Sequence, residues 1–440
     1  MTDTPSSTPT GEAVSPRVAG YGLFMLTIVY AFNFVDRQIL VILQEPIKLE
    51  LGLSDAQLGL LSGFSFALVY ITAGIPIAYW ADRTNRRNII AAALTIWSGM
   101  TAVSGFAQTY TQLLLARIGV GIGEAGGSPP AHSMISDYYP PERRGTALAI
   151  YSTGVHVGIL LGFLIGGFVS QIYGWRVAFM AVGIPGVLFA IVFFLTVREP
   201  PRGHWESAES ADYKPTLRET LDVLASYRSF WYIAGAAGLA AFVGYGSGNF
   251  APSFLVRMHG MEMGEIGVIL ALFGGGGGLI GTFLGGFLAD RLGVKDKRWY
   301  LWLPAIAGAI GIPLGLPYLL SDNTTLAIGF MFLVTIAINT YLGPCLAMSH
   351  ALVPPAMRAL TSAVLFFVLN LIGLGLGPLT AGLLSDFYTG YVGEQGLRYA
   401  LITIAVMGAP SVLLFVLAAR QLPADLARGE QLNRAREVAG

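Results

Sequence analysis

The amino-acid sequence predicts an all-α membrane protein with twelve transmembrane helices in two pseudo-symmetric six-helix bundles. Of its 440 residues, 54% are hydrophobic and 12% are charged, whereas soluble domains carry about a quarter charged residues. Apolar runs of about twenty residues, long enough to cross roughly 30 Å of hydrocarbon, occur twelve times. Short sequence elements of the first half recur at matching places in the second half, which indicates an internal duplication.

The expected spans are approximate at their ends, and the longest polar connection separates the sixth from the seventh. They cover residues 20–44, 57–80, 89–107, 111–138, 146–171, 176–197, 229–256, 265–289, 299–320, 324–353, 359–385 and 397–419. The expected organisation is a disordered cytoplasmic tail (1–17), an N-terminal six-helix bundle (18–197), a central cytoplasmic loop (198–228), a C-terminal six-helix bundle (229–420) and a cytoplasmic tail (421–440).

The basic residues set the expected orientation. If both termini are cytoplasmic, 20 of the 26 Lys and Arg residues lie in cytoplasmic segments. The outer loops hold Lys48, Arg176, Arg257 and Arg398. This asymmetry follows the positive-inside rule and predicts a multi-pass protein of a bacterial inner membrane. The remaining two basic residues, Arg37 and Arg117, lie inside expected spans and need a separate explanation.

Composition and motifs exclude several classes of function. The net charge of zero gives no basic bias towards nucleic acid, and the single Cys345 cannot form an internal disulfide. The sequence contains no P-loop, nucleophile elbow, cysteine cluster or histidine-rich metal pattern, so it predicts neither an enzyme nor a cofactor or metal. The expected partners are a small amphipathic substrate, protons and membrane lipids, with the protein acting as a monomer.

The internal duplication is visible in two pairs of loops. The segment "AYWADRTNRR" (78–87) follows the second span, and "GFLADRLGVK" (286–295) follows the eighth, with a shared Ala-Asp-Arg offset by 208 residues. In the same way "PPERRGTALA" (140–149) follows the fourth span and "PPAMRALTSA" (354–363) follows the tenth. Each half therefore repeats the plan of the other.

Together with the twelve-span plan and the long central loop, these loops resemble those of the major facilitator superfamily. The first loop departs from the family pattern, because Ala78 and Asn85 stand where the family usually has glycines. In the fifth span, "STGVHVGILLGFLIGG" (152–167) resembles the family's antiporter motif but has Phe163 at the usual proline, so an antiport direction is not secured.

The resemblance implies that the cytoplasmic loop charges form a gate whose residues pair across helix ends when the inner side is shut. The alternative is that these charges are solvated and serve only the topology. The gate candidates are Asp82, Arg83, Arg86, Arg87, Arg143, Arg144, Asp290 and Arg291.

Three longer segments resemble the Spinster branch of lysolipid and sphingolipid transporters. They are "NFVDRQIL" (33–40), "RIGVGIGEAGGSPPAHSMISDYYPPERRG" (117–145) and "ALAIYSTGVHVG" (147–158). The resemblance implies a proton-linked carrier of amphipathic lipids or lipid-like anions, without fixing the substrate.

The fourth span can also be interpreted from its own residues. At 100° per residue, Arg117, Glu124 and Ser128 share one stripe of a helix, whereas Gly119, Gly123 and Gly127 form a small-residue ridge on another face. The ridge predicts close helix packing, and helix five carries a similar glycine ridge. The polar stripe places an arginine and an acid inside the bilayer, where each charge costs about 2.5–3.5 kcal/mol on insertion scales.

A second acid, Asp36, is expected at a depth similar to that of Glu124. Two acids that compete for one arginine can couple proton binding to conformation. We therefore expect Asp36 and Glu124 to form a proton-responsive pair, with Arg117 as the cation that switches between them. The alternative is a fixed Arg117–Glu124 ion pair with only a packing role. Arg37 is expected to line the outer cavity or to reach the membrane interface.

The second half carries no charged residue away from its span ends, so an apolar C-terminal half is expected to face a polar N-terminal half. An amphiphile would place its headgroup near Arg117 and its chain along aromatic side chains, including Phe366 and Phe367; alternatively, these aromatics face lipid. His132 and His156 are candidates for proton relay or packing. The substrate-binding candidates are Arg37, Arg117, Ser128, His156, Tyr245, Asn249, Phe250, Phe254, Asn339 and Asn370.

Three classes of function follow. A proton-coupled carrier of a lipid or organic anion explains the duplication, the loop motifs and the buried charges. A drug or sugar porter of the same fold explains all of these but not the apolar second half. The third class is a membrane enzyme or a receptor that does not transport a substrate.

Overall fold

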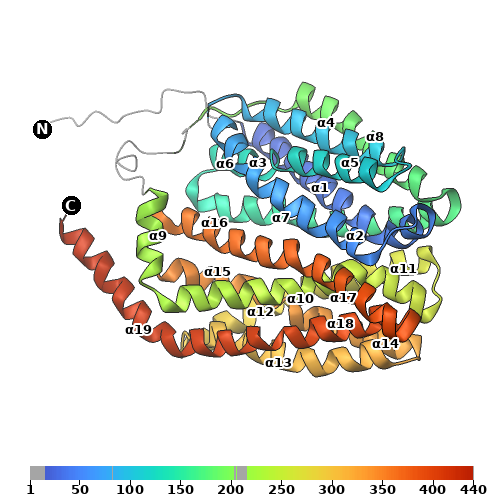
Figure 1. The fold of residues 1–440 in the computed structure, drawn as a ribbon. Coiled ribbons are helices and arrows are strands. Elements are labelled where there is room, and N and C mark those ends of the chain that lie inside the picture. The colour runs from blue at the N-terminus through green and yellow to red at the C-terminus, as the bar shows by residue number, and fades with distance from the viewer. Residues whose placement is uncertain (1–14, 82, 203–204, 206–215, 440) are drawn as a thin grey trace, which may run out of the picture.

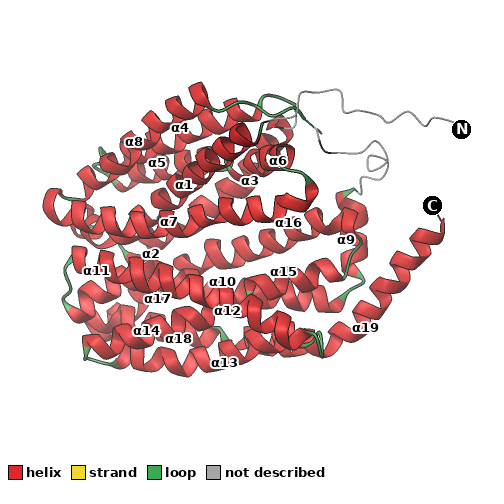
Figure 2. Cartoon of the chain, turned by 180° about the vertical axis from the view of Figure 1, so that it is seen from behind, coloured by secondary structure: helices red, strands yellow, loops and turns green. Residues whose placement is uncertain are grey.

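The computed structural model describes residues 15–81, 83–202, 205 and 216–439, and these fold almost entirely into helices (Figure 2). The helices form two bundles that lie side by side (Figure 1). We call the bundle of α1 to α8 the N-half and the bundle of α10 to α19 the C-half. The prediction of an all-α fold with two six-helix bundles is confirmed.

The helix bounds follow the expected spans to within a few residues at most ends. The N-half contains α1 (Pro16–Leu51), α2 (Asp55–Gly59), α3 (Ser65–Ala81), α4 (Arg86–Ser104), α5 (Tyr110–Glu124), α6 (Ser128–Tyr138), α7 (Pro141–Tyr173) and α8 (Trp175–Thr196). The C-half contains α10 (Arg228–His259), α11 (Met263–Ile269), α12 (Gly276–Gly293), α13 (Trp299–Leu320), α14 (Thr324–Ile338), α15 (Leu342–Ala351), α16 (Arg358–Leu369), α17 (Gly377–Val392), α18 (Gly396–Met407) and α19 (Ala409–Ala439). Short π-helical turns join α2 to α3 (Leu60–Phe64), α11 to α12 (Leu270–Gly275) and α16 to α17 (Asn370–Leu376).

Eight helical stretches of the described chain are long and apolar enough to cross a membrane. One of them, Pro355–Gly429, contains two expected spans. The expected spans 89–107, 111–138 and 229–256 fall outside this group. The second of these carries Arg117 and Glu124, whose charges lower its mean hydropathy.

Glycines at the ends of two long helices display the internal duplication. Gly52 ends α1 with φ +64°, and Gly260 ends α10 with φ +62°. This left-handed conformation closes a helix and favours glycine, because a side chain would be strained there. The two caps are 208 residues apart, the same offset as the repeated Ala-Asp-Arg loop.

Breaks of three residues interrupt two expected spans, a single residue, Gly408, interrupts the twelfth between α18 and α19, and in this detail the prediction of continuous helices is wrong. The fourth span breaks at Ala125–Gly127 between α5 and α6, and the tenth breaks at Asn339–Tyr341 between α14 and α15. Prolines follow both breaks and lack the N–H that would continue the helical hydrogen bonds. The breaks lie 214 residues apart, at corresponding places of the two halves. The first break places Glu124 at the end of a helix rather than in its middle.

Glycine ridges pack helices within the N-half, as the sequence predicts. A Cβ atom added to Gly154 of α7 would lie 2.6 Å from the Thr27 carbonyl oxygen of α1, Gly158 and Gly162 also meet the α1 backbone, and Gly166 meets the side chain of Ile42. The ridge of α5 packs against α4, where a Cβ atom at Gly123 would lie 2.7 Å from the Trp97 backbone nitrogen. Backbones this close leave no room for a side chain.

One end of the molecule carries the central connection and the end of α19, and we call it the terminal face (Figure 1). The opposite end is the far face. The central connection, expected to be a loop, contains the helix α9 (Leu217–Ala225), which begins with a capping box of Thr216 and Glu219. From Ala409, α19 continues without a break through the expected tail to Ala439.

Contacts at the terminal face hold this tail against the C-half. The buried carboxylate of Asp425 accepts a hydrogen bond from the Ser229 backbone N–H at 2.8 Å, in the first turn of α10. Arg428 donates to the Ser226 carbonyl oxygen at 2.8 Å. The tail therefore satisfies backbone groups where α9 and α10 meet.

Replacing Asp425 with alanine is expected to free the tail. The substitution removes the acceptor for a helix-end N–H, a loss that costs about 0.5–2 kcal/mol. Hydrogen exchange of the α10 first turn and of residues 421–429 should become faster, while exchange in the N-half stays as in the wild type. Unchanged exchange in both segments would show that the tail is held by its apolar contacts alone.

Candidate functional site

Four charged side chains meet in the middle of the N-half, where α1 passes α5. Asp36, Arg117 and Glu124 are 0%, 2% and 1% exposed. Arg37 Nε lies 2.7 Å from Glu124 Oε2, forming an ion pair between α1 and α5. Arg117 donates from Nη2 to the backbone carbonyl oxygen of Asp36 at 3.3 Å.

Adjacent residues on α1 point in different directions, which is why Asp36 and Arg37 have different partners. The carboxylate of Asp36 faces α4 near the hydroxyl groups of Ser98 and Thr101, without a hydrogen bond to either, and it is close enough to Arg117 and Glu124 to feel their charges. The side chain of Arg37 is 23% exposed and extends towards the end of α5. The break after Glu124 ends the helix at the residue that Arg37 reaches.

The partner of Glu124 differs from the sequence-based interpretation. That interpretation paired Glu124 with Arg117, but Arg37 forms the ion pair in the structure. Arg117 and Glu124 are seven residues apart on α5, which separates their backbones by about 10.5 Å along the helix axis. Arg37 lies on the neighbouring helix α1, so its side chain does not have to span this distance to contact Glu124. The cluster thus has two acids and two arginines, and its formal charge is zero.

Asp36 and Arg117 are the least satisfied members of the cluster. Both carboxylate oxygens of Asp36, and the Nε and Nη1 atoms of Arg117, form no hydrogen bond with the described residues. The charges of Asp36 and Glu124 both stabilise the guanidinium, while Arg37 opposes it. A buried charge with few hydrogen bonds depends on nearby opposite charge, because it has lost its hydration. Arg117 is therefore held by the field of the two acids rather than by one fixed partner.

The other candidates of the N-half lie near this cluster or on α7. Ser128 begins α6 beside a cavity of about 10 Å³, which Asn33 and Trp97 also line. His156 on α7 is half-buried, and His132 on α6 is exposed with its ring edge-on to Tyr151.

The substrate-binding candidates of the C-half mostly form hydrogen bonds within their own helices or are buried in the protein interior. Asn249 donates to the Tyr245 carbonyl oxygen at 2.9 Å, and Asn339 donates to Thr335 at 2.8 Å. Phe250 and Phe254 are fully buried in the interior, so neither is accessible to a substrate in this conformation. Asn370 is half-buried in its π-helical turn, and the preceding helix exposes Phe366 and Phe367 by 37% and 49%.

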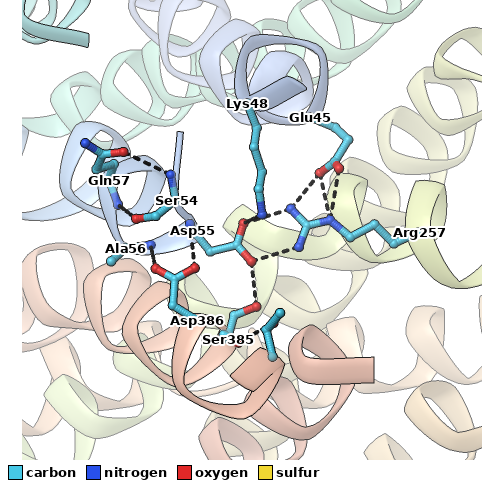
Figure 3. A network of polar contacts seen from close by, with 10 residues as sticks. Glu45, Lys48, Ser54, Asp55, Ala56, Gln57, Arg257, Ser385 and Asp386 are labelled. Atoms are coloured by element: carbon cyan, nitrogen blue, oxygen red, sulfur yellow. Dashed lines mark hydrogen bonds and ion pairs between the residues drawn. The ribbon is translucent and has the colours of Figure 1, made fainter. Parts of the chain in front are cut away.

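The far face contains a charged network that the sequence analysis did not predict (Figure 3). Arg257 of α10 makes two hydrogen bonds of 2.8 Å to the carboxylate of Asp55 in α2. The same guanidinium donates to Glu45 of α1 at 2.8 and 3.0 Å, and Lys48 lies 2.7 Å from Asp55. Arg257 thereby ties the C-half to two helices of the N-half.

A second connection in this network joins α17 to α2. Asp386 accepts hydrogen bonds from the backbone N–H groups of Asp55 and Ala56 at 2.9 and 2.8 Å. Ser385 donates to Asp55 at 2.6 Å. A carboxylate of the C-half thus caps a helix of the N-half, where the helix dipole favours negative charge. We call Glu45, Lys48, Asp55, Arg257, Ser385 and Asp386 the far-face network.

At the terminal face, the gate candidates pair within their own halves among the described residues. Arg86 is 2% exposed and forms ion pairs with Asp137 and Glu199, and Arg144 donates to the Ser136 and Tyr139 carbonyl oxygens. Arg87 donates its backbone N–H to Glu199. These pairs join the ends of N-half helices to the start of the central connection.

The remaining gate candidates are exposed. Asp290 accepts a hydrogen bond from the Tyr300 hydroxyl at 2.7 Å, the guanidinium of Arg83 lies over the Tyr79 ring, and Arg143 and Arg291 extend from the surface. Asp82 lies outside the described residues. The hydrogen bonds that join the two halves among the described residues lie at the far face, so the halves are tied together there.

Comparison with known proteins agrees with this architecture. Residues 26–374 match the Major Facilitator Superfamily. An efflux pump of this superfamily from Mycolicibacterium smegmatis is 34% identical over 93% of this chain and 95% of its own. Human protein spinster homolog 1 is 26% identical, over 95% of this chain and 84% of its own.

A solved structure is similarly close. It is a bacterial homolog of the human lysosomal transporter Spinster in an inward-facing, unoccupied conformation. It superposes with a TM-score of 0.88 at 35% identity, covering 94% of this chain and 99% of the other. The chain belongs to the Major Facilitator Superfamily of membrane transporters. Within that superfamily it is a transporter of the Spinster type, and it is not an enzyme.

The far-face network escaped sequence analysis because its members are far apart in the chain. Asp55 and Arg257 are separated by 202 residues, and Asp55 and Ser385 by 330. Lys48 and Arg257 were counted only as outer-loop charges. A partial signal was present, because Ser54 and Gln57 form a capping box that marks Asp55 as a helix start.

Proposed function

We propose that this transporter works by alternating access and that proton binding to the N-half cluster controls its conformation. The ion pair between Arg37 and Glu124, beside buried Asp36 and Arg117, is the observation that carries the proposal. Charges at this depth are costly and persist where they pair or perform work. With the terminal face in the cytoplasm of a bacterial cell, the far-face network would close the carrier to the outside, and the similar solved structure is itself inward-facing.

The cluster supports a simple coupling scheme. The Arg37–Glu124 pair requires an ionised Glu124, so proton binding at Glu124 removes the charge that holds Arg37. Arg117, whose Nε and Nη1 atoms form no hydrogen bond with the described residues, can then balance Asp36 or meet an anionic group of the substrate. A conformation with the intact pair therefore loses population as the pH falls.

The proposed substrate is an amphipathic anion of lysolipid or sphingolipid type. Its headgroup would approach the two arginines, and its chain would lie against the C-half, whose α16 exposes Phe366 and Phe367. Asn249 and Asn339, which bond their own helices here, supply amide groups for a substrate once those bonds are released. The absence of charged residues away from span ends in the C-half supports an apolar partner over a sugar.

Transport into liposomes that contain the purified protein tests this function. A proton gradient should drive uptake of a labelled lysolipid, an uncoupler should abolish the uptake, and unlabelled lysolipid should compete where sugars do not. Competition by sugars or small organic anions, but not by lysolipid, would favour the second candidate, a sugar or organic-anion porter. Binding without uptake would contradict a transport function for the site.

A further inference from the structure

A small cavity lies beside the charged cluster, where α1 and α4 meet the break between α5 and α6. Its volume is about 10 Å³, roughly the space that one water molecule requires. Its lining includes Asn33, Trp97, Gly127 and Ser128, together with the rings of Tyr30 and Tyr151. Gly127 belongs to the break and Ser128 begins α6, so the cavity lies next to the end of α5, at Glu124.

The cavity lies on the terminal-face side of the cluster. Tyr21, near the start of α1, donates a hydrogen bond to Thr196 at the end of α8, where the central connection leaves the N-half. Asn33 lies almost one helical turn before Asp36, which makes it closer to that face. Asn33 is buried and Ser128 is half-buried, so the wall of the cavity leads from the interior to an accessible side chain.

Two buried polar groups beside the cavity form no hydrogen bond with the described residues. They are the Nε1–H of Trp97 and the Oε1 atom of Glu124, and these side chains belong to residues that are 0% and 1% exposed. The Asn33 amide lies close to the Glu124 carboxylate without a hydrogen bond to Oε1, so Asn33 borders both the cavity and the acid. Buried water commonly satisfies polar groups of this kind.

The two carboxylate oxygens of Glu124 have different surroundings. Oε2 lies 2.7 Å from Arg37 Nε, whereas Oε1 has no hydrogen-bond partner among the described residues. Oε1 is therefore the oxygen that is free to accept a proton. Proton transfer requires a donor within hydrogen-bond reach, either directly or through one water molecule. Since no described side chain donates to Oε1, water is the donor that this site can use.

We propose that the cavity holds one water molecule that carries protons between the terminal face and Glu124. The inference rests on the proposed control of the carrier by a proton on Glu124. The water gives one proton to Glu124 Oε1 and receives one from solvent beside Ser128, so the carboxylate becomes neutral and the terminal side loses one proton. Asn33, Trp97 and Ser128 position the water, because the indole N–H donates a hydrogen bond and the amide and hydroxyl groups both donate and accept.

Several titratable groups surround Glu124 and the cavity. They are Asp36, Arg37 and Tyr30 on α1, Arg117 on α5, His132 on α6, and Tyr151 and His156 on α7. The sequence of α3 contains no Asp, Glu, Lys, Arg or His, and α4 carries Arg86 and Arg87 only at its start. Among all these residues, Glu124 and Asp36 are the ones that give a carboxyl infrared band when protonated, so substitution of either acid assigns the band.

Time-resolved infrared spectroscopy after a jump from high to low pH tests this route in the full-length protein. The band of protonated Glu124 is the one that Glu124→Gln removes and Asp36→Asn retains. Ser128→Ala removes a polar contact of the water, and Gly127→Ala fills its space with a methyl group. In both variants the rate at which the band appears should fall about a hundredfold, the lower end of what a positioned proton donor contributes. The final band intensity at each pH should stay as in the wild type, and Ser128→Thr, which keeps the hydroxyl, should retain the wild-type rate.

Ser152→Ala is the matched control, because the Ser152 side chain is exposed and donates to the Leu148 carbonyl oxygen within α7. If Ser128→Ala and Gly127→Ala become protonated as fast as this control, the water route is refuted. A change of the final band intensity in proportion to the rate would also refute it, since the two residues would then act on the stability of the acid. If the Glu124 band of the wild type does not respond to pH, the proposed proton control fails instead.

Discussion

Replacing Arg257 with alanine is expected to open the far face of the transporter. The side chains of Asp55 and Glu45 are 1% and 8% exposed, and Arg257 makes hydrogen bonds to both. Removing one partner of a buried ion pair costs about 3–5 kcal/mol, and here Glu45 loses the arginine that it pairs with while Asp55 keeps Lys48 as its ion-pair partner. In the open state these carboxylates regain water. The closed state therefore bears most of this cost, which corresponds to a shift of two to three orders of magnitude in the equilibrium.

Electron-spin distances between labels on α2 and α17 would measure this opening. Arg176→Ala is the matched control, since Arg176 is also a far-face arginine but pairs with Glu50 inside the N-half. That pair is half-exposed, and exposed pairs contribute little. Closed-state distances in Arg257→Ala would contradict the role given to the far-face network.

Replacing Arg117 with alanine is expected to destabilise the N-half more than any other single change in the cluster. It leaves Arg37 as the only cation for two buried acids, Asp36 and Glu124. The expected loss is again about 3–5 kcal/mol, since a stranded buried carboxylate has to bind a proton or admit water. The melting temperature in detergent should fall clearly below that of the wild type.

A second substitution distinguishes stranded charge from lost packing. Asp36→Asn in the Arg117→Ala background removes the stranded acid while keeping a side chain of the same shape. We expect this double variant to recover part of the lost stability, because residues of one charge network are not additive. If Asp36→Asn lowers stability equally in the presence and absence of Arg117, the two residues do not interact as described.

The fold was predictable because hydropathy is a local property of the sequence and because the duplication repeats short motifs at matching places in the two halves. Spans such as 299–320 and 176–197 match α13 and α8 closely, since twenty apolar residues in a bilayer have to form a helix. The glycine ridge of α7 was likewise readable from its four-residue spacing. The breaks after Glu124 and Ile338 were missed, although Pro129 and Pro344 were visible, because prolines are tolerated in transmembrane helices.

The sequence predicted which charged residues form the site, but it did not predict which of them pair with each other. Asp36, Arg117 and Glu124 stand out as charges inside apolar spans, and the structure brings all three together with Arg37. Which arginine meets Glu124 depends on the rotation of α1 against α5, which one sequence does not specify. The far-face network needed tertiary structure for the same reason, as its ion pairs connect helices of different halves.

The central claim is that a proton on Glu124 controls the balance of conformations, and Glu124→Gln tests it most directly. Glutamine keeps the shape of the side chain, imitates the protonated acid and removes the ion pair with Arg37. The measurement is the distance between spin labels on both faces from pH 4 to 9, in the wild type and the variant. The wild type should move from the closed far face at high pH towards the open far face at low pH, and Glu124→Gln should favour the open far face at every pH. A full wild-type pH response in Glu124→Gln would contradict the account and assign the Arg37–Glu124 pair a packing role only.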